Sequence, residues 1–178
     1  MKKPLAVLSA ALILALTGCS DNPGAEITPS AAVSTPAVSP SPETASVRDY
    51  LAALTPSMRT VDEWLDEWKD SGCSASGIND DVFCGINITT AGWSGGGIES
   101  TINSAAQTAS SAYIGAPPPE LEGILGKTKA TAQNISSEAK KWDAADCPGN
   151  DGCVGYAFNV WRGMGDLSDH FASMEVYK

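Results

Sequence analysis

The sequence is poor in histidine, in basic residues and in aromatic residues. It has one histidine, and its 11 lysine and arginine residues face 21 aspartate and glutamate residues, giving a net charge of −10. Nucleic acid or anionic lipid headgroups would need a basic face, so this balance argues against both as partners. Aromatic residues make up 7% of the chain. No apolar run reaches the roughly 20 residues that a membrane-spanning helix needs.

Motifs that point to an enzyme are also missing from the sequence. Di-iron bundles use Glu-x-x-His pairs, but the single His170 is preceded by Asp166 and Asp169 instead. No Gly-x-Ser-x-Gly elbow and no phosphate-binding glycine loop occurs. A hydrolase is kept as an alternative, and it would need a serine or carboxylate within hydrogen-bond reach of His170. We expect no catalytic residue, metal or cofactor, and a protein that acts by binding.

The N-terminus has the pattern of an export signal. Lys2 and Lys3 precede an apolar run over residues 5–16, and that run ends in Leu16-Thr17-Gly18-Cys19. A short basic stretch followed by 7–15 apolar residues is typical of secretory signal peptides. The tetrapeptide resembles the lipobox of bacterial lipoproteins. The resemblance implies that residues 1–18 are removed and that Cys19 carries a diacylglyceryl group. The alternative is an ordinary signal peptide with an incidental cysteine.

The lipoprotein resemblance implies a membrane-anchored, extracytoplasmic protein of the cell membrane or outer membrane. Loss of residues 1–18 would change the net charge from −10 to −12. Residues 19–45 hold the lipidated cysteine and then a stretch dominated by proline, serine, threonine and alanine. Such a segment cannot bury a core and predicts a disordered tether. The remaining residues, 46–178, suit one domain with one core.

Four cysteines remain after Cys19, namely Cys73, Cys84, Cys147 and Cys153. An even number in an exported chain predicts two disulfides, for which three pairings exist. The local pairing, Cys73 with Cys84 and Cys147 with Cys153, needs the least chain closure. A zinc site is the competing interpretation, but the cysteine spacings are loose for it and no histidine lies nearby.

Three stretches of the domain, over residues 47–68, 121–142 and 153–174, have apolar or small residues at alternating spacings of four and three. This pattern keeps one stripe on one face of a helix. Pro56 either kinks the first helix or starts it at position N1 after Thr55. A weaker, alanine-rich stripe runs from Ile98 to Ala112. Four such helices with short connections predict an all-α, antiparallel up-down four-helix bundle, stapled by the two disulfides.

The second helix is the irregular one, because Trp93-Ser94-Gly95-Gly96-Gly97 interrupts it. We expect a short helix from about Asp81 to Ala91, a break, and a longer helix from about Gly97 to Ile114. The triplet Trp93-Ser94-Gly95 matches the Trp-x-Gly signature of small helical-hairpin proteins of type VII secretion. Those proteins have neither an export peptide nor a lipid anchor, so we expect instead a tryptophan that packs over a glycine break.

In an up-down bundle the first and third turns lie at the end away from the tether. Both expected disulfides, three tryptophans and several acids fall there. The candidate binding surface comprises Trp64, Trp68, Trp142, Asp143, Asp146 and Asp151. Loops on a rigid scaffold commonly carry function, which favours recognition at this end. The simpler interpretation is that each tryptophan caps the core and the acids are solvated. Both interpretations stay open for the end as a whole.

The sequence therefore predicts a lipid-anchored binding or interaction module of the bacterial cell envelope. We expect a membrane contact through the lipid on Cys19, a protein or cell-wall partner, and no nucleic acid. Two further alternatives are a superinfection-exclusion lipoprotein or inhibitor of an envelope enzyme, and a purely structural envelope protein. A dense exposed patch of aromatic and acidic residues would favour the first of these.

Overall fold

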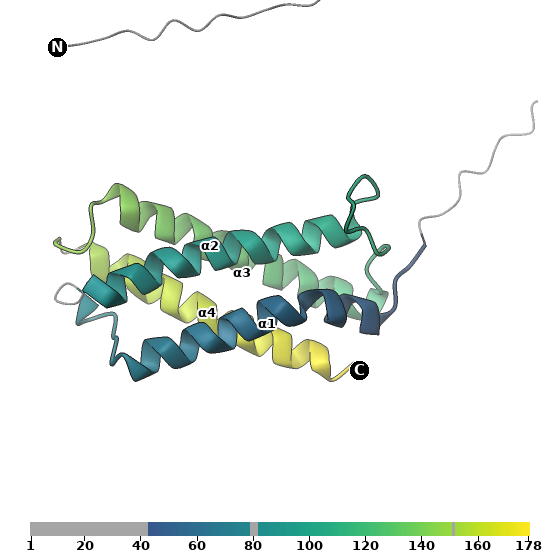
Figure 1. Ribbon diagram of the computed structural model, residues 1–178, viewed down its shortest axis with the longest axis horizontal. Helices are drawn as coiled ribbons and strands as arrows, with labels where there is room; N and C mark the ends of the chain where they lie inside the picture. The colour runs from purple at the N-terminus through teal and green to yellow at the C-terminus, as the bar shows by residue number, and fades with distance from the viewer. Residues whose placement is uncertain (1–42, 79–81, 151) are drawn as a thin grey trace, which may run out of the picture. The chain divides into compact units, whose positions relative to one another are not determined.

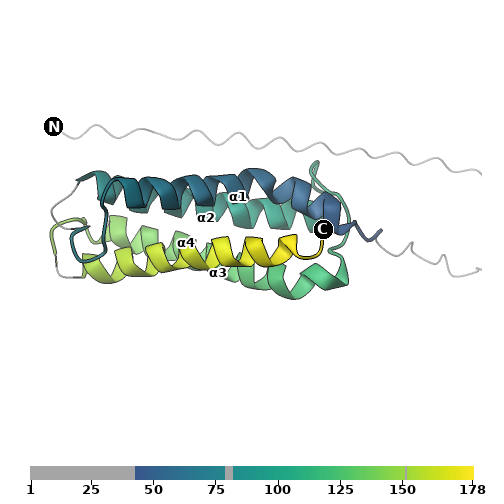
Figure 2. The same ribbon diagram turned by 90° about the horizontal axis from the view of Figure 1, so that it is seen from below.

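The computed structural model describes residues 43–78, 82–150 and 152–178, which form four antiparallel helices (Figure 1). Figure 2 shows α1 and α2 side by side over α4 and α3. The predicted all-α, up-down four-helix bundle is confirmed. The predicted signal peptide, Cys19 and most of the predicted tether lie outside the described residues, as does Asp151. The helices are α1 (Val47–Asp70), α2 (Val82–Ala106), α3 (Pro119–Ala144) and α4 (Cys153–Glu175).

Helix α1 has well-defined signals at both ends. Ser46 and Asp49 form a capping box, in which each side chain bonds the backbone N–H of the other residue. Pro56 lies inside the helix, so it does not mark the N1 position. The helix ends before Gly72, whose φ of +67° suits glycine and turns the chain away.

The predicted break in the second helix is wrong, because α2 is continuous from Val82 to Ala106. Gly95 is buried against α3, where an added Cβ would lie 2.6 Å from the carbonyl oxygen of Ala132. The glycines of this stretch therefore let two helices approach closely, and tertiary packing overrides their weak helix propensity. Trp93 does not pack over them, since it is 75% exposed. The helix also ends earlier than expected, at Ala106, and residues 107–118 form a turn-rich connection.

At one end of the bundle, which we call the near end, the start of the described chain pairs with the connection between α2 and α3. The backbone N–H of Ala45 donates to the carbonyl oxygen of Ala116 at 2.9 Å, and that of Ala116 donates to Glu43 at 2.8 Å. The Tyr50 hydroxyl donates to the Gly115 carbonyl at 3.0 Å. Burial raises the pKa of Tyr50 above its usual value, with a smaller contribution from Tyr113. These bonds already include Glu43 and Ala45, which precede the predicted domain start at 46.

The opposite end, which we call the far end, consists of the turn after α1 and the turn after α3. Cys73 is bonded to Cys84 and Cys147 to Cys153, so the predicted local pairing is confirmed. Disulfides persist in oxidising compartments, and the two bonds indicate an extracytoplasmic environment. Within the described ranges, none of the helices has the length and apolar character to cross a membrane.

A buried carboxylate joins α3 to α4 in the interior. Glu138 is 5% exposed, accepts a hydrogen bond from Asn159 Nδ2 at 2.8 Å, and is ion-paired with Lys141. Burial raises the pKa of Glu138, but the bonds from Lys141 and Asn159 outweigh it, so the pKa lies below its usual value. A buried charge with partners of this kind is satisfied rather than strained.

Candidate functional site

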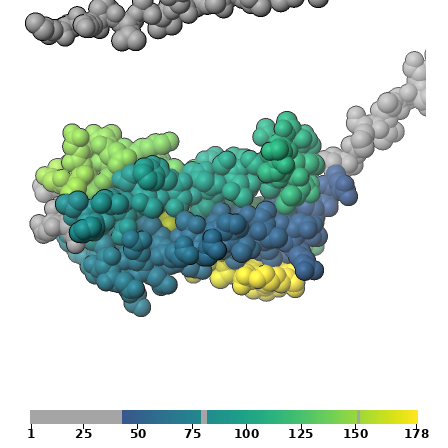
Figure 3. Space-filling model, in the orientation of Figure 1, coloured from purple at the N-terminus to yellow at the C-terminus, as the bar shows by residue number. Residues whose placement is uncertain are grey.

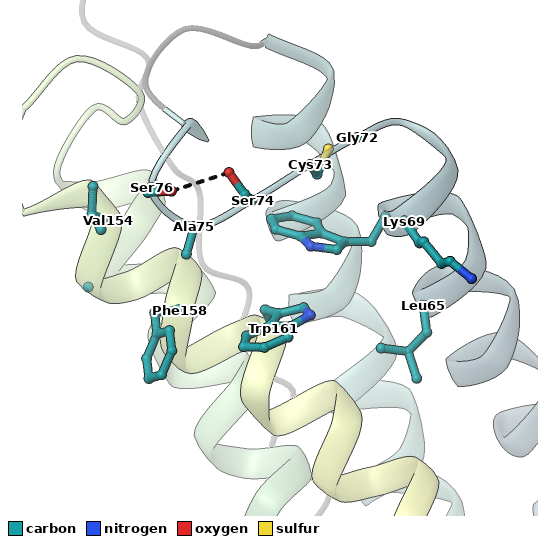
Figure 4. Close-up of a pocket in the computed structure, with 12 residues that line it drawn as sticks. Leu65, Lys69, Gly72, Cys73, Ser74, Ala75, Ser76, Val154, Phe158 and Trp161 are labelled. Atoms are coloured by element: carbon teal, nitrogen blue, oxygen red, sulfur yellow. Dashed lines mark hydrogen bonds between the residues drawn. The ribbon is translucent and has the colours of Figure 1, made fainter.

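An apolar groove of about 930 Å³ opens at the far end, between α1, the turn that follows it, and α4. Figure 4 shows Trp161 of α4 between Leu65 of α1 and Phe158 of α4, with Ala75 of the first turn above the two rings. A hollow of this size, lined mainly by apolar and aromatic side chains, has the character of a binding pocket. Its lining comprises Leu65, Trp68, Lys69, Gly72, Cys73, Ser74, Ala75, Ser76, Val154, Gly155, Phe158 and Trp161.

Helix α4 supplies the exposed aromatic wall of the groove. Phe158 is 45% exposed and Trp161 is 42% exposed, and their ring centroids lie 5.9 Å apart in a tilted arrangement. With Val154 they form a second apolar stripe at spacings of four and three, one residue along from the buried stripe. Large half-exposed aromatic side chains lose much water-accessible area on contact, which makes them typical anchors of interfaces.

The inner wall of the groove is fixed by two stacked tryptophans of α1. Trp64 and Trp68 lie 5.1 Å apart with nearly parallel rings, and both are almost fully buried. The Trp64 indole N–H donates to the carbonyl oxygen of Asn87 on α2 at 2.8 Å. Trp68 therefore presents a rigid surface, because its neighbour is held from behind by both packing and a hydrogen bond.

The first turn forms the third wall and is held by covalent and hydrogen bonds. Cys73 is bonded to Cys84 of α2, and its backbone N–H donates to the Trp68 carbonyl at 3.0 Å. Ser74 accepts a bond from the Gly77 N–H, and its hydroxyl lies 3.4 Å from that of Ser76. The groove is thus bounded by elements whose positions the disulfide restrains.

We call the exposed second half of α1 beside the groove its rim, and this surface is acidic, although none of its acids is among the described lining residues. The exposed surface of the second half of α1 carries five acids and two bases: Asp62, Glu63, Asp66, Glu67, Asp70, Arg59 and Lys69. Arg59 pairs with Glu63 at 3.4 Å, and Asp62 accepts a bond from Ser168 of α4 at 3.3 Å. Lys69 lines the groove, but its ammonium group points away from Phe158 and Trp161 (Figure 4). The α1 side therefore carries net negative charge beside an apolar floor.

The predicted site residues do not form one surface. Trp64, Trp68 and Trp142 are 3%, 4% and 2% exposed, so they cap the core, although Trp68 also lines the groove. Asp143 and Asp146 are exposed at the far end, and Asp143 accepts a hydrogen bond from the Thr89 hydroxyl of α2 at 3.0 Å. Asp143 therefore lies on the α2–α3 side of the far end, and neither acid is among the described lining residues of the groove between α1 and α4.

Sequence reasoning missed Phe158 and Trp161, although the pattern contains their signal. Both follow Val154 at helical spacing and adjoin a stripe that alone accounts for the buried face of α4. An aromatic pair next to a complete core stripe indicates an exposed apolar face. A similar face exists on α2, where Val82, Phe83, Ile86 and Trp93 are 69%, 74%, 55% and 75% exposed.

Figure 3 shows the light-green surface of the end of α3 next to the teal surface of α2 at the far end. A smaller hollow, of about 330 Å³, lies on the α2–α3 side between Trp93 and Asp143. It is smaller than the groove and contains both Lys140 and Asp143. The groove between α1 and α4 is therefore the stronger candidate for binding an apolar group.

The hydrolase alternative depends on His170. His170 lies on α4, and its buried Nδ1 atom has no hydrogen-bond partner among the residues described. A general base needs a partner that orients it and a nucleophile within reach, and His170 shows no such partner at this nitrogen. Within the described ranges, no three histidine, cysteine, aspartate or glutamate side chains are grouped to hold a metal ion.

Comparison with known proteins adds no relative to these observations. No family model matches the chain, and neither curated proteins nor solved structures give a match. The site must therefore be interpreted from its own geometry.

Proposed function

We propose that this protein is a lipid-anchored, extracytoplasmic lipoprotein that captures a protein or cell-wall partner at the far end of its bundle. The observation that carries the proposal is the apolar groove with two half-exposed aromatic rings, set between disulfide-held elements. The chain enters the bundle at the near end, where Ala45 pairs with Ala116. An anchor on Cys19 would thus hold the groove on the side away from the tether.

The anchor and the capture site are tested separately. Cys19→Ala should give a protein that accumulates as precursor or leaves the membrane fraction, as the lipobox resemblance implies. A variant that matures and fractionates like the wild type would refute the anchor. That result would leave the capture site untouched, because the groove is built only from residues of the folded domain.

Site-specific photo-crosslinking in living bacteria tests the capture site. A photoreactive side chain at Ser76, which lines the groove, should trap a discrete envelope component. The same group at Gln107, exposed in the connection at the near end, should trap none. Crosslinks at Gln107 with none at Ser76 would move the site to the near end and refute the proposal.

Inhibition of an envelope enzyme is the second candidate. The acidic exposed surface of α1 and the half-exposed rings of Phe158 and Trp161 on α4 favour it, since both helices contribute to the same groove. Identification of the component trapped at Ser76 distinguishes an enzyme from a cell-wall polymer or a structural protein.

A further inference from the structure

We infer that the groove between α1 and α4 binds a cationic amphipathic helix of a partner protein. This inference rests on the proposed function and names the class of partner and the way in which it docks. Three features carry it: the shape of the groove, its apolar floor with aromatic anchors, and the charge of its rim.

The shape of the groove suits a short helix. Its α4 wall runs from Val154 to Trp161, which is two helical turns, or about 10 Å at 1.5 Å per residue. Helices α1 and α4 diverge toward the far end (Figure 1), which leaves a channel into which a third row of side chains can insert. A helix fills such a channel with residues at positions i, i+3 or i+4, and i+7.

The floor of the groove requires apolar side chains from the partner. Leu65 of α1 and the half-exposed rings of Phe158 and Trp161 of α4 line the hollow (Figure 4). Among the lining residues that the structure describes, Lys69 alone is ionic, and its side chain points outward. A charged group at the centre of the ligand would lose its water in this groove without gaining an oppositely charged partner. The charges of the bound segment must therefore lie at its edges.

The rim of the groove selects basic flanking residues. Asp66 and Asp70 are exposed on α1 one helical turn apart, with Asp62 one turn before them. On α4, Arg162 and Asp166 line a separate hollow toward α3, so the charge of the rim is that of the exposed α1 surface. Lysine or arginine on the edges of an inserted helix would complement this rim and speed its association.

The same charges argue against other occupants. A second copy of this chain would bring one acidic rim against another, and the chain carries a net charge of −10. An anionic lipid surface would meet the same repulsion. An acidic helix has the right shape but the wrong charge, so it provides the matched negative probe.

The experiment uses the full chain in phosphatidylcholine nanodiscs, with empty nanodiscs as the blank. The probes are two fluorescent 14-residue helices with identical leucine positions. All remaining positions are lysine in one helix and glutamate in the other. We expect the leucine–lysine helix to bind saturably, and the leucine–glutamate helix to bind at least tenfold more weakly. Equal binding of the two would overturn the charge assignment.

Matched variants locate the binding of the leucine–lysine helix. Trp161→Ala and Phe158→Ala should each weaken it about tenfold, whereas Trp93→Ala, which removes an exposed tryptophan of α2, should change it less than twofold. Asp66→Lys with Asp70→Lys should slow association. Melting temperatures equal to that of the wild type show that the variants are folded. Because there are two separate groove variants, the test still works if one of them fails to fold. An equal effect of Trp93→Ala and Trp161→Ala would refute the groove as the site.

Two outcomes separate this inference from the proposed function. If neither helix binds but crosslinking at Ser76 traps a component in cells, the protein captures a partner of another class and only this inference fails. If the chain forms dimers that Trp161→Ala abolishes, as sedimentation would show, a second copy covers the groove and the inference is overturned.

Discussion

The two long seams of the bundle differ in how closely their helices meet. Between α2 and α3, glycine and alanine face each other: a Cβ on Gly92 would overlap the Ala139 side chain, and one on Gly95 would reach the backbone of α3. Between α1 and α4, leucine and aromatic side chains stand at the far end and leave a groove. Small residues close one seam, and large residues hold the other open where it can bind.

Polar contacts follow the same division. Across the α2–α3 seam, the Ser136 hydroxyl donates to the Gly92 carbonyl at 2.7 Å, and Gln133 donates to Glu99 at 2.6 Å. Across α1 and α4, Ser168 donates to Asp62 at 3.3 Å, beyond the groove. The closed seam is therefore expected to carry stability, and the open one to carry binding.

The largest expected effect comes from replacing one tryptophan of each seam with alanine. Trp142 is 2% exposed and packs against Gly85 of α2, so Trp142→Ala should lower the free energy of unfolding by about 3 to 5 kcal/mol. Trp161 is 42% exposed, and Trp161→Ala should cost about 1 kcal/mol or less. Urea unfolding measures both. Similar losses would mean that the α1–α4 seam is as tightly packed as the other.

The disulfides give the next largest effect and separate the two turns of the far end. Replacing Cys73 and Cys84 with alanine should cost about 3 kcal/mol, and replacing Cys147 and Cys153 about 2 kcal/mol, because the first pair closes the longer loop. The first pair also holds a wall of the groove. Binding of the leucine–lysine helix should therefore weaken in the first variant and persist in the second. Loss of binding in the second alone would assign the site to the third turn.

The sequence was sufficient for the architecture because each of three stripes fills one buried helix face, from Val47 to Trp68 in α1 for example. It failed at Trp93–Gly97, since a run of glycines looks the same whether it breaks a helix or lets a neighbour approach. That distinction depends on the position of α3, and local helix propensity contains no information about the position of a neighbouring helix. The pairing of the cysteines was predictable because helix order places each pair in one turn.

The candidate site was predictable only in its location at the far end. A tryptophan at the end of an apolar stripe can cap the core or face the solvent, and the sequence does not separate these. Trp64 and Trp142 cap the core, while Trp161, outside the main stripe of α4, faces the groove. Which seam opens depends on the sizes of the side chains that face each other across two helices. It therefore depends on the register between segments that are far apart in the sequence.

A smaller effect is expected from single methyl groups in α2. Gly95→Ala places a Cβ 2.6 Å from a backbone oxygen that cannot move cheaply, so it should lower stability by about 1 kcal/mol despite better helix propensity. Gly97→Ala is the matched control, because a Cβ there meets nothing within 4 Å, and it should raise stability by about 0.5 to 1 kcal/mol. Thermal and urea unfolding give the sign of each change. An increase in stability for both variants would show that the α2–α3 seam can accommodate an additional methyl group.

The smallest effect concerns the link between α3 and α4 and depends on pH. The pKa of Glu138 lies below its usual value, so its carboxylate stabilises the fold above the unfolded pKa and loses that contribution as pH falls through the folded pKa. Glu138→Gln should therefore be less stable than wild type by about 1 kcal/mol at pH 7, and the difference should shrink below about pH 4.5.

The control for this pH effect is Glu67→Gln, on the exposed face of α1, which should change stability by less than about 0.5 kcal/mol. Urea unfolding from pH 7 to pH 3 compares the three proteins. Asn159→Ala should remove part of the same pH dependence, since its amide donates to the Glu138 carboxylate. A Glu138→Gln difference that stays constant with pH would mean that the buried side chain acts through shape alone. The α3–α4 contact would then owe its stability to packing, as the α2–α3 seam does.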